Sequence, residues 1–249
     1  MNILLTIFFF TACLICNGQE TTKITRNIKG AAYLVEDYYV LKSDKTIRHG
    51  EYNKLRITNG SLIENGFYKM GLRDSLWRRF NCVGSTLNST GSYRDGEKIG
   101  IWKYYGSNGV IEQVYNHSTN ELISNTIVEP VDSNKLYRVF SGNDTLFTKL
   151  EKAPMCIGGL NNQINSNINY PSDAREKGKT GKVIISFIID KSGKTRDHRV
   201  LKGIGYGCDE EALRIATDYL SYWSPGILNA KPIDIEYILP ITFKIEVFK

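Results

Sequence analysis

Few residues of this chain have the types and spacing that enzyme chemistry requires. The sequence holds three histidines, His49, His117 and His198, and none lies at metal-ligand spacing from cysteines or carboxylates. It also lacks a Gly-x-Ser-x-Gly nucleophile motif, a phosphate-binding loop and a pair of carboxylates spaced for acid–base catalysis. We therefore expect a protein that is not an enzyme and that needs no metal and no cofactor.

The N-terminus has the pattern of an export signal. Ile3 to Cys16 form an apolar run, which is shorter than the roughly 20 residues that a transmembrane helix needs. Small polar residues follow it up to Gln19, so we expect a signal peptide over residues 1–19 that is cleaved near Gln19. The residues around Cys13 also resemble a degenerate lipoprotein box, which leaves a lipid anchor at Cys13 as an alternative.

Three cysteines remain after such a cleavage, namely Cys82, Cys156 and Cys208. An odd number leaves at least one thiol unpaired in an oxidising compartment. A Cys156 to Cys208 bridge would tie the start of the C-terminal region to its second helix. Free, buried cysteines are the alternative that we favour.

Composition indicates a globular, β-rich protein. The 249 residues are 41% hydrophobic and 23% charged, which suits one large domain or two modest ones. The 15 Tyr and 22 Gly against 6 Pro favour many short strands and turns. The net charge of +6 is mild, and no basic run interleaved with aromatic residues indicates a nucleic-acid partner.

A unit of about 25 residues repeats in the first half of the chain. The pairs in register are Gly66 and Gly91, Tyr68 and Tyr93, Gly71 and Gly96, Trp77 and Trp102, and Phe80 and Tyr105. A degenerate copy precedes them at Gly50 to Tyr52, and Asn59-Gly60 and Asn108-Gly109 are dipeptides typical of two-residue hairpin turns. We therefore expect each unit to form a β-hairpin.

This pattern, over residues 48–123, resembles bacterial MORN-type repeats. Stacked hairpins would bury a row of Tyr and Trp that no single unit could cover. We favour a structural spine for these aromatic residues, and an exposed ligand-binding face is the alternative. Beyond the repeats, Lys135 to Phe140 and Thr145 to Leu150 predict a connecting hairpin around Gly142.

The last part of the chain predicts the order helix, strand, strand, helix, strand. A short helix over Pro171 to Lys177 precedes a strand from Gly181, in which apolar residues alternate. The expected elements that follow are a second strand over 195–202, a helix from 209 to about 223 and a long alternating strand over 233–247. Since Pro240 cannot donate to a β-ladder, we expect this final strand at a sheet edge or a β-bulge at Pro240.

Ordered landmarks from about residue 154 to residue 248 resemble the C-terminal domain of TonB, a bacterial envelope protein. The landmarks include Tyr170-Pro171, Gly181-Lys182-Val183, Glu211-Ala212-Leu213, Pro225-Gly226 and Leu239-Pro240-Ile241-Thr242-Phe243. The resemblance implies an α+β fold with a three-stranded antiparallel sheet packed by two helices. We expect three parts: a signal peptide (1–19), a MORN-type β-hairpin repeat domain (20–150) and a TonB C-terminal-like domain (151–249).

The resemblance also implies a binding mode. The TonB C-terminal domain captures an extended segment of an outer-membrane receptor, the TonB box, by β-strand addition at the sheet edge. The residues implied at this peptide-binding site are Tyr170, Pro171, Ile235, Tyr237 and Leu239. Alternating apolar side chains in a strand belong first to the core, so we expect binding to rest on the backbone.

Two departures from the family keep an alternative open. Asn167-Ile168 stand where the family usually has Gln-Pro, and after cleavage of the leader the chain would lack the inner-membrane anchor of an energy transducer. We therefore expect either a TonB-like protein in support of energised transport, or a non-energised periplasmic adaptor that binds an envelope protein or glycan. A homodimer through the edge strand is a further alternative.

Overall fold

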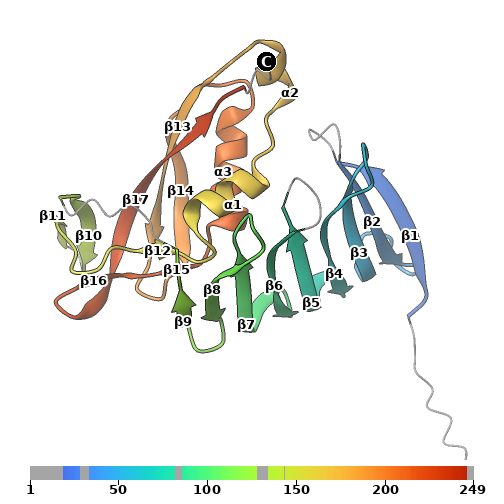
Figure 1. Ribbon diagram of the computed structural model, residues 1–249, viewed down its shortest axis with the longest axis horizontal. Coiled ribbons are helices and arrows are strands. Elements are labelled where there is room, and N and C mark those ends of the chain that lie inside the picture. The colour runs from blue at the N-terminus through green and yellow to red at the C-terminus, as the bar shows by residue number, and fades with distance from the viewer. Residues whose placement is uncertain (1–18, 29–33, 82–85, 128–133, 143, 246–249) are drawn as a thin grey trace, which may run out of the picture.

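The computed structural model describes residues 19–28, 34–81, 86–127, 134–142 and 144–245. Its first half is a nine-stranded antiparallel meander, in which each strand pairs with the next one along the chain (Figure 1). The strands are β1 (Thr21–Asn27), β2 (Leu34–Leu41), β3 (Arg48–Arg56), β4 (Leu62–Lys69), β5 (Leu72–Phe80), β6 (Leu87–Arg94), β7 (Glu97–Tyr105), β8 (Ile111–Asn116) and β9 (Glu121–Asn125). The predicted hairpin repeats are thus present, as one continuous sheet.

The tight turns lie at other positions than predicted. Met70-Gly71 and Asp95-Gly96 join β4 to β5 and β6 to β7, with φ of 49° and 83° and of 50° and 85°. Positive φ at both central residues is the geometry of a two-residue hairpin turn. Asn59-Gly60 and Asn108-Gly109 instead lie in longer loops, where only the glycine has positive φ and the Asn side chain accepts a backbone N–H bond.

The aromatic residues of the repeats form a continuous buried stack across the sheet. The ring centroids of Tyr68 and Trp77 lie 5.2 Å apart, those of Trp77 and Tyr93 5.7 Å, and those of Tyr93 and Trp102 5.1 Å. Trp77 is 2% exposed and Trp102 is 3% exposed. This confirms the interpretation of the aromatic residues as a structural spine.

The repeated glycines are required by this stack. A Cβ atom on Gly66 would lie 2.2 Å from the Trp77 ring, and one on Gly91 would lie 2.3 Å from the Trp102 ring. Each tryptophan therefore lies across the bare backbone of a glycine on the preceding strand. This contact explains why glycine and tryptophan recur at a fixed spacing in the repeat.

The second half of the chain folds around a six-stranded sheet in the order β11-β10-β17-β13-β14, with β16 also paired to β17 (Figure 1). Its strands are β10 (Tyr137–Ser141), β11 (Asp144–Thr148), β13 (Gly181–Ile189), β14 (Thr195–Lys202), β16 (Gly226–Leu228) and β17 (Lys231–Phe243). The helices are α1 (Leu160–Asn167), α2 (Ser172–Glu176) and α3 (Cys208–Tyr219), and β12 (Met155–Cys156) pairs with β15 (Trp223–Ser224). The inner face of β13 and β17 and the apolar face of α3 form one core.

The second half of the chain therefore has more elements than the predicted three-stranded sheet with two helices. The expected hairpin of β10 and β11 is present, but it extends this sheet through β17, and α1 is an additional helix. Trp223 lies in β15, since α3 ends at Tyr219. The strand β10 itself was predicted, but its pairing with β17, about a hundred residues further along the chain, was not.

Cys156 and Cys208 are both buried and neither forms a disulfide, as favoured from the sequence. Each is 0% exposed within the core of the second half. The predicted alternative of a bridge between them is wrong. Cys82 and the leader, with Cys13, lie outside the described residues.

The two halves of the molecule are joined by polar contacts around α1, which lies against the ends of β7 and β8 (Figure 1). The Gln113 side chain accepts a hydrogen bond from the Gly158 N–H at 2.6 Å. Asn162 donates to the Tyr105 carbonyl at 3.1 Å and accepts from Asn88 at 2.9 Å. These bonds hold the C-terminal sheet against the repeat sheet.

Candidate peptide-binding edge of the C-terminal sheet

The strand predicted to form the sheet edge is paired on both sides over its first half. β17 pairs with β13 from Ile235 to Phe243. On its other side, β16 pairs with residues 231–233 and β10 pairs with residues 234–236. The edge-strand prediction is therefore wrong for residues 231–236, because segments distant in sequence occupy that side.

The attachment of β10 rests on a carboxylate at the middle of the sheet. Glu236 accepts a hydrogen bond from the Ser186 hydroxyl at 2.6 Å and pairs with Arg138 of β10 at 3.2 Å and with Arg199 of β14. The hydrogen bond from Ser186 is the main cause that lowers the pKa of Glu236, although burial opposes it. One ionised side chain thus links four neighbouring strands across the outer face.

The second half of β17 keeps one side open. No strand in the described part of the chain pairs with residues 238–243 on the side opposite β13, and we call this segment the open edge. Pro240 lies within it and is paired across from Ile184. Because proline has no N–H, it is tolerated where its nitrogen faces away from the neighbouring strand, which here is β13. Residues two positions apart in a strand direct their backbone groups to the same side, so the N–H groups of Ile238 and Thr242 also point to the open edge.

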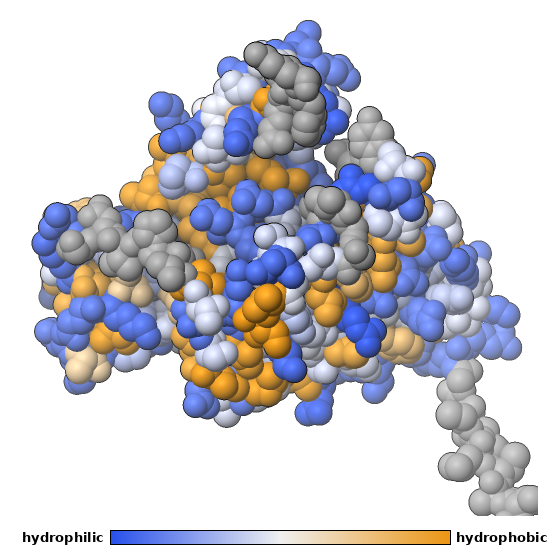
Figure 2. All heavy atoms as spheres, in the orientation of Figure 1, coloured by the Kyte–Doolittle hydropathy of each residue, from blue (hydrophilic) through white to orange (hydrophobic). Residues whose placement is uncertain are grey.

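A groove borders the lower end of the open edge. It has a volume of about 380 Å³ and lies between β10, β11 and β17, lined among others by Tyr137, Phe147 and Ile238. Phe147 is 68% exposed and Ile238 is 49% exposed. Figure 2 shows apolar side chains over the upper parts of β13 and β17, whereas hydrophilic side chains prevail around β1. An extended segment with apolar side chains fits this chemistry.

Three predicted site residues lie in β17 with their side chains directed inward. Ile235 is 0% exposed and Leu239 is 4% exposed, so both belong to the core. The Tyr237 ring packs at a tilt against Trp223 with 4.8 Å between ring centroids, and the Lys135 ammonium lies 4.4 Å from the centre of the Tyr237 ring. Their side chains support the strand, and only the backbone is available to a partner.

The Tyr-Pro element lies at the far end of the same strand. The Tyr170 ring contacts Phe243, the last residue of β17, with 5.9 Å between ring centroids, and its hydroxyl donates to the Lys179 carbonyl. Pro171 is the N-cap of α2. At about 3.4 Å per residue, Ile235 lies more than 20 Å from Phe243 along the strand. The structure thus places Tyr170 at the Phe243 end of the open edge and Ile235 beyond its other end.

Four residues that border this edge were missed from the sequence: Lys135, Arg138, Phe147 and Glu236. Arg138 and Phe147 lie in the β10–β11 hairpin, which the sequence places before the TonB-like landmarks. A single alternating strand does not indicate which distant strand it joins. One signal was the charge of Glu236 within a strand of alternating apolar residues, since a largely buried carboxylate needs a cationic partner.

The fold of the second half is that of a small α+β domain in which a hairpin and a long third strand pack on one helix. Residues 166–245 match the family model described as Gram-negative bacterial TonB protein C-terminal, which confirms the predicted resemblance for this part of the chain. The match begins within α1 and ends just after β17, so it includes neither the nine-stranded sheet nor the β10–β11 hairpin. No curated protein matches the chain. The MORN-type resemblance of the repeats stays a prediction.

Two further searches of the described residues bear on function. None of the helices there is long and apolar enough to cross a bilayer. No group of three or more His, Cys, Asp or Glu side chains is placed there to hold a metal ion.

Proposed function

We propose that this protein is a TonB-like component of the cell envelope that captures an extended protein segment by β-strand addition at the open edge of β17. The segment is the TonB box of an outer-membrane receptor, and capture supports energised transport across that membrane. The observation that carries this proposal is the unpaired side of residues 238–243 within a domain that matches the TonB C-terminal family. Binding, and not catalysis, is the proposed activity.

The open edge limits the length of the captured segment. β10 closes the edge at Glu236, and Tyr170 lies at its other end, beside Phe243. About six residues of peptide fit between them, with each backbone bond contributing roughly 0.5–1.5 kcal/mol net. Ile235, Tyr237 and Leu239 would act by holding the strand rigid, and Tyr170-Pro171 by bounding the peptide.

A non-energised adaptor in the periplasm is the second candidate. It is favoured by the direct bonds between the two halves, such as the 2.6 Å bond from the Gly158 N–H to Gln113, which join the TonB-like domain to the repeat sheet. Such a protein would bind an envelope protein or glycan without transmitting force. We propose export by the N-terminal leader in either case, with lipidation at Cys13 or dimerisation through the open edge as variants of this candidate.

Substitution of one edge residue tests the strand-addition mechanism. Ile238→Pro removes an N–H group from the open edge, whereas Ile238→Thr keeps the N–H and changes only the exposed side chain. Synthetic TonB-box peptides from receptors of the source bacterium serve as the probe, with affinity measured by calorimetry on the full mature chain. Ile238→Pro should weaken binding about fivefold or more, since one bond contributes about 1 kcal/mol, and Ile238→Thr by less. Equal affinities of Ile238→Pro and wild type would contradict the mechanism.

Cell fractionation separates the two candidates. An energy transducer requires a retained or acylated N-terminus at the inner membrane. An adaptor predicts a mature form that begins near Glu20, or a lipid-anchored form elsewhere in the envelope, as mass measurement of the N-terminus would establish.

A further inference from the structure

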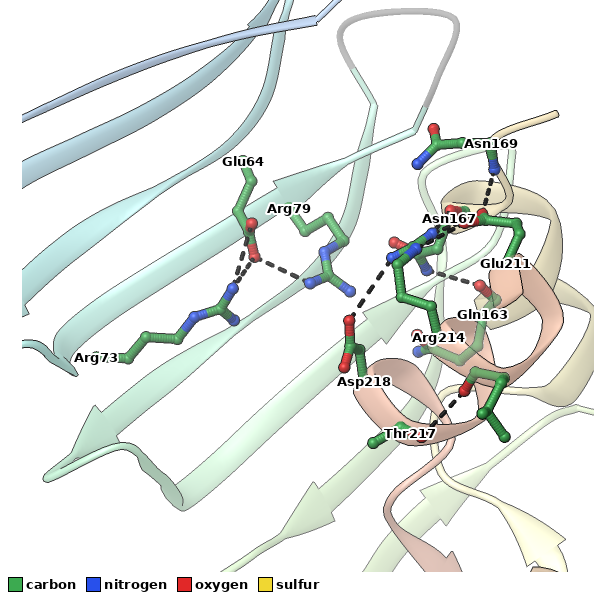
Figure 3. Close-up of polar contacts among 11 residues, drawn as sticks. Glu64, Arg73, Arg79, Gln163, Asn167, Asn169, Glu211, Arg214, Thr217 and Asp218 are labelled. Atoms are coloured by element: carbon green, nitrogen blue, oxygen red, sulfur yellow. Dashed lines mark hydrogen bonds and ion pairs between the residues drawn. The ribbon is translucent and has the colours of Figure 1, made fainter. Parts of the chain in front are cut away.

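A polar cavity lies where the repeat sheet meets the end of α3. Its volume is about 340 Å³, and the repeat sheet contributes Ser89, Arg73, Arg79 and Lys98 to its walls. The C-terminal half closes it with Tyr219 and Tyr222, which flank the end of α3. Figure 3 shows Arg73 and Arg79 directed toward Glu64 on one side, with Arg214 and Asp218 of α3 on the other. This cavity lies away from the open edge, and peptide capture makes no use of it.

The repeat places one cation per unit over the aromatic stack. Arg48, Arg73 and Lys98 are spaced by 25 residues. Arg48 lies 5.5 Å from the centre of the Tyr52 ring, Arg73 lies 4.2 Å from that of Trp77 and Lys98 lies 4.4 Å from that of Trp102, and each ring belongs to the fourth residue after its cation. Arg48 and Arg73 donate to the hydroxyls of Tyr68 and Tyr93 at 3.3 and 3.1 Å, whereas Lys98 donates to Tyr104 of its own strand at 3.3 Å. The three cations thus occupy equivalent places over the rings.

In the first two units, a carboxylate neutralises this cation. Glu36 pairs with Arg48 at 2.9 Å, and Glu64 pairs with Arg73 at 3.2 Å. Burial disfavours the Glu64 carboxylate, but Arg73 and Arg79 outweigh burial and lower its pKa to about 2. Paired buried charges of this kind are strongly coupled, because removal of one partner leaves the other without compensation.

The third unit has a serine in place of the carboxylate. Glu64 of β4 is paired across from Arg79 of β5. Ser89 of β6 and Tyr104 of β7, each 25 residues later, are paired across from each other in the same way, so Ser89 takes the position of Glu64 in the third unit. Among the described residues, no carboxylate lies within ion-pair distance of Lys98. Burial, and then the charges of Arg79 and Arg73, lower the pKa of Lys98 to about 7. The cavity wall therefore includes Arg73, Arg78, Arg79 and Lys98 against two carboxylates, Glu64 and Asp218, and Glu64 is already shared by Arg73 and Arg79.

Asp218, the other carboxylate of the cavity wall, does not neutralise Lys98. Asp218 is 52% exposed in its side chain and pairs with Arg214 at 3.7 Å. Trp77 and Trp102 also line the cavity, but Arg73 and Lys98 lie over their rings, so cations and hydroxyl groups are the polar partners that a ligand meets there. Charge-assisted hydrogen bonds from Lys and Arg are the usual means of holding carboxylate and phosphate groups.

We propose that this cavity binds a small hydroxylated anion, such as a sugar acid or a sugar phosphate. Its carboxylate or phosphate group takes the place beside Lys98 and Arg79 that a glutamate side chain occupies in the preceding units. Its hydroxyl groups face Ser89, Tyr93 and Tyr222 on the cavity wall. This binding function goes beyond peptide capture and does not depend on it.

Calorimetry on the full mature chain with four probes tests the ligand class. The probes are glucuronate, glucose 6-phosphate, inorganic phosphate and neutral glucose. At least one of the two sugar anions should bind at least tenfold more tightly than glucose and than inorganic phosphate. Glucuronate alone would identify a carboxylate site, and glucose 6-phosphate alone a phosphate site. Equal affinity for glucose, or no binding of either sugar anion at millimolar concentration, would overturn the proposal.

Two variants connect the binding to the missing carboxylate. In Ser89→Glu, the new carboxylate should take the place of the ligand's anionic group beside Lys98 and weaken anion binding at least tenfold. Ser124→Glu, on exposed β9, should leave anion binding unchanged. Lys98→Met should weaken binding similarly, and Lys103→Met, on the exposed side of the same strand, should leave it unchanged. Thermal melting checks the fold of each variant. Wild-type affinity in folded Ser89→Glu would refute the assigned position.

The pH dependence provides a readout that a general loss of structure would not produce. The groups facing Lys98 are Arg73 and Arg79 of β5, Tyr93 of β6, Tyr104 of β7, His117 after β8, Cys156 of β12, Lys194 before β14 and Tyr222 after α3. Burial, and then Lys98 and Lys194, lower the pKa of His117 to about 2, so it stays neutral. Glucuronate should bind about tenfold more tightly at pH 6 than at pH 8.5, because the anion selects protonated Lys98. Lys98→Arg should remove this dependence, and its persistence in that variant would contradict the role of Lys98.

Discussion

Gly91→Ala adds one methyl group at the point where the aromatic stack crosses the backbone. The new Cβ atom would lie 2.3 Å from the Trp102 ring, far inside van der Waals contact. Trp102 is 3% exposed and packs edge-on against Tyr93 at 5.1 Å, so the methyl group would displace a buried ring from its contacts. Overpacking of a buried core costs about 1–3 kcal/mol, and we expect a loss near the upper end of that range in the free energy of unfolding.

Urea denaturation, followed by tryptophan fluorescence and far-ultraviolet circular dichroism, measures this loss. The matched background is Trp102→Phe, in which a smaller ring leaves room for the methyl group. Gly91→Ala should cost at least about 1 kcal/mol less in that background, as a double-mutant cycle would report. Gly142→Ala controls for backbone strain alone, since its φ is 61° and no atom lies within 4 Å of the added Cβ. A Gly91→Ala protein as stable as wild type, or an equal cost in both backgrounds, would refute the reasoning.

Three further predictions concern buried polar groups and thiols. Glu64→Gln should lose about 3 kcal/mol of stability at neutral pH, because the pKa of Glu64 falls from an ordinary 4.5 to about 2 in the folded state. A lowered pKa gives stability that is present above pH 4.5 and lost as the pH falls toward 2, so urea melts of the variant and wild type should converge there. Cys156 and Cys208 should react with a thiol reagent only after unfolding, and any native disulfide in peptide maps would contradict this. Arg138→Ala removes a partner of Glu236 and should speed hydrogen exchange of β10 amides, while exchange in β1 stays unchanged.

The local elements of the fold could be predicted where periodicity and turn chemistry agree. The strand from Gly181 has Val183, Ile185, Phe187 and Ile189 on one face, the helix with Ala212 and Ile215 has acidic residues in its first turn, and both elements are present. The 25-residue spacing of Trp77 and Trp102 was sufficient to predict stacked hairpins with a buried spine. These features depend on neighbours within a few dozen residues, which the sequence shows directly.

The surroundings of the candidate site could not be predicted in this way. β10 joins β17 through a pairing of Arg138 with Glu236, a contact between residues far apart in sequence. The cavity at Lys98 depends on the absence of a carboxylate at Ser89, which becomes meaningful only when strand register aligns Ser89 with Glu64. Register across a sheet and attachment of a distant hairpin are tertiary properties, and composition or periodicity does not encode them.

Hydrogen–deuterium exchange of the full chain, with and without a TonB-box peptide, tests the central claim most directly. Strand addition at the open edge predicts new protection of the Ile238 and Thr242 amides, since these N–H groups would bond to the added strand. Protection in β13, which is already paired on both sides, should change little. New protection confined to β14, β11, β1 or β9, the outer strands of the two sheets, or no protection in a saturated complex, would contradict peptide capture by β17.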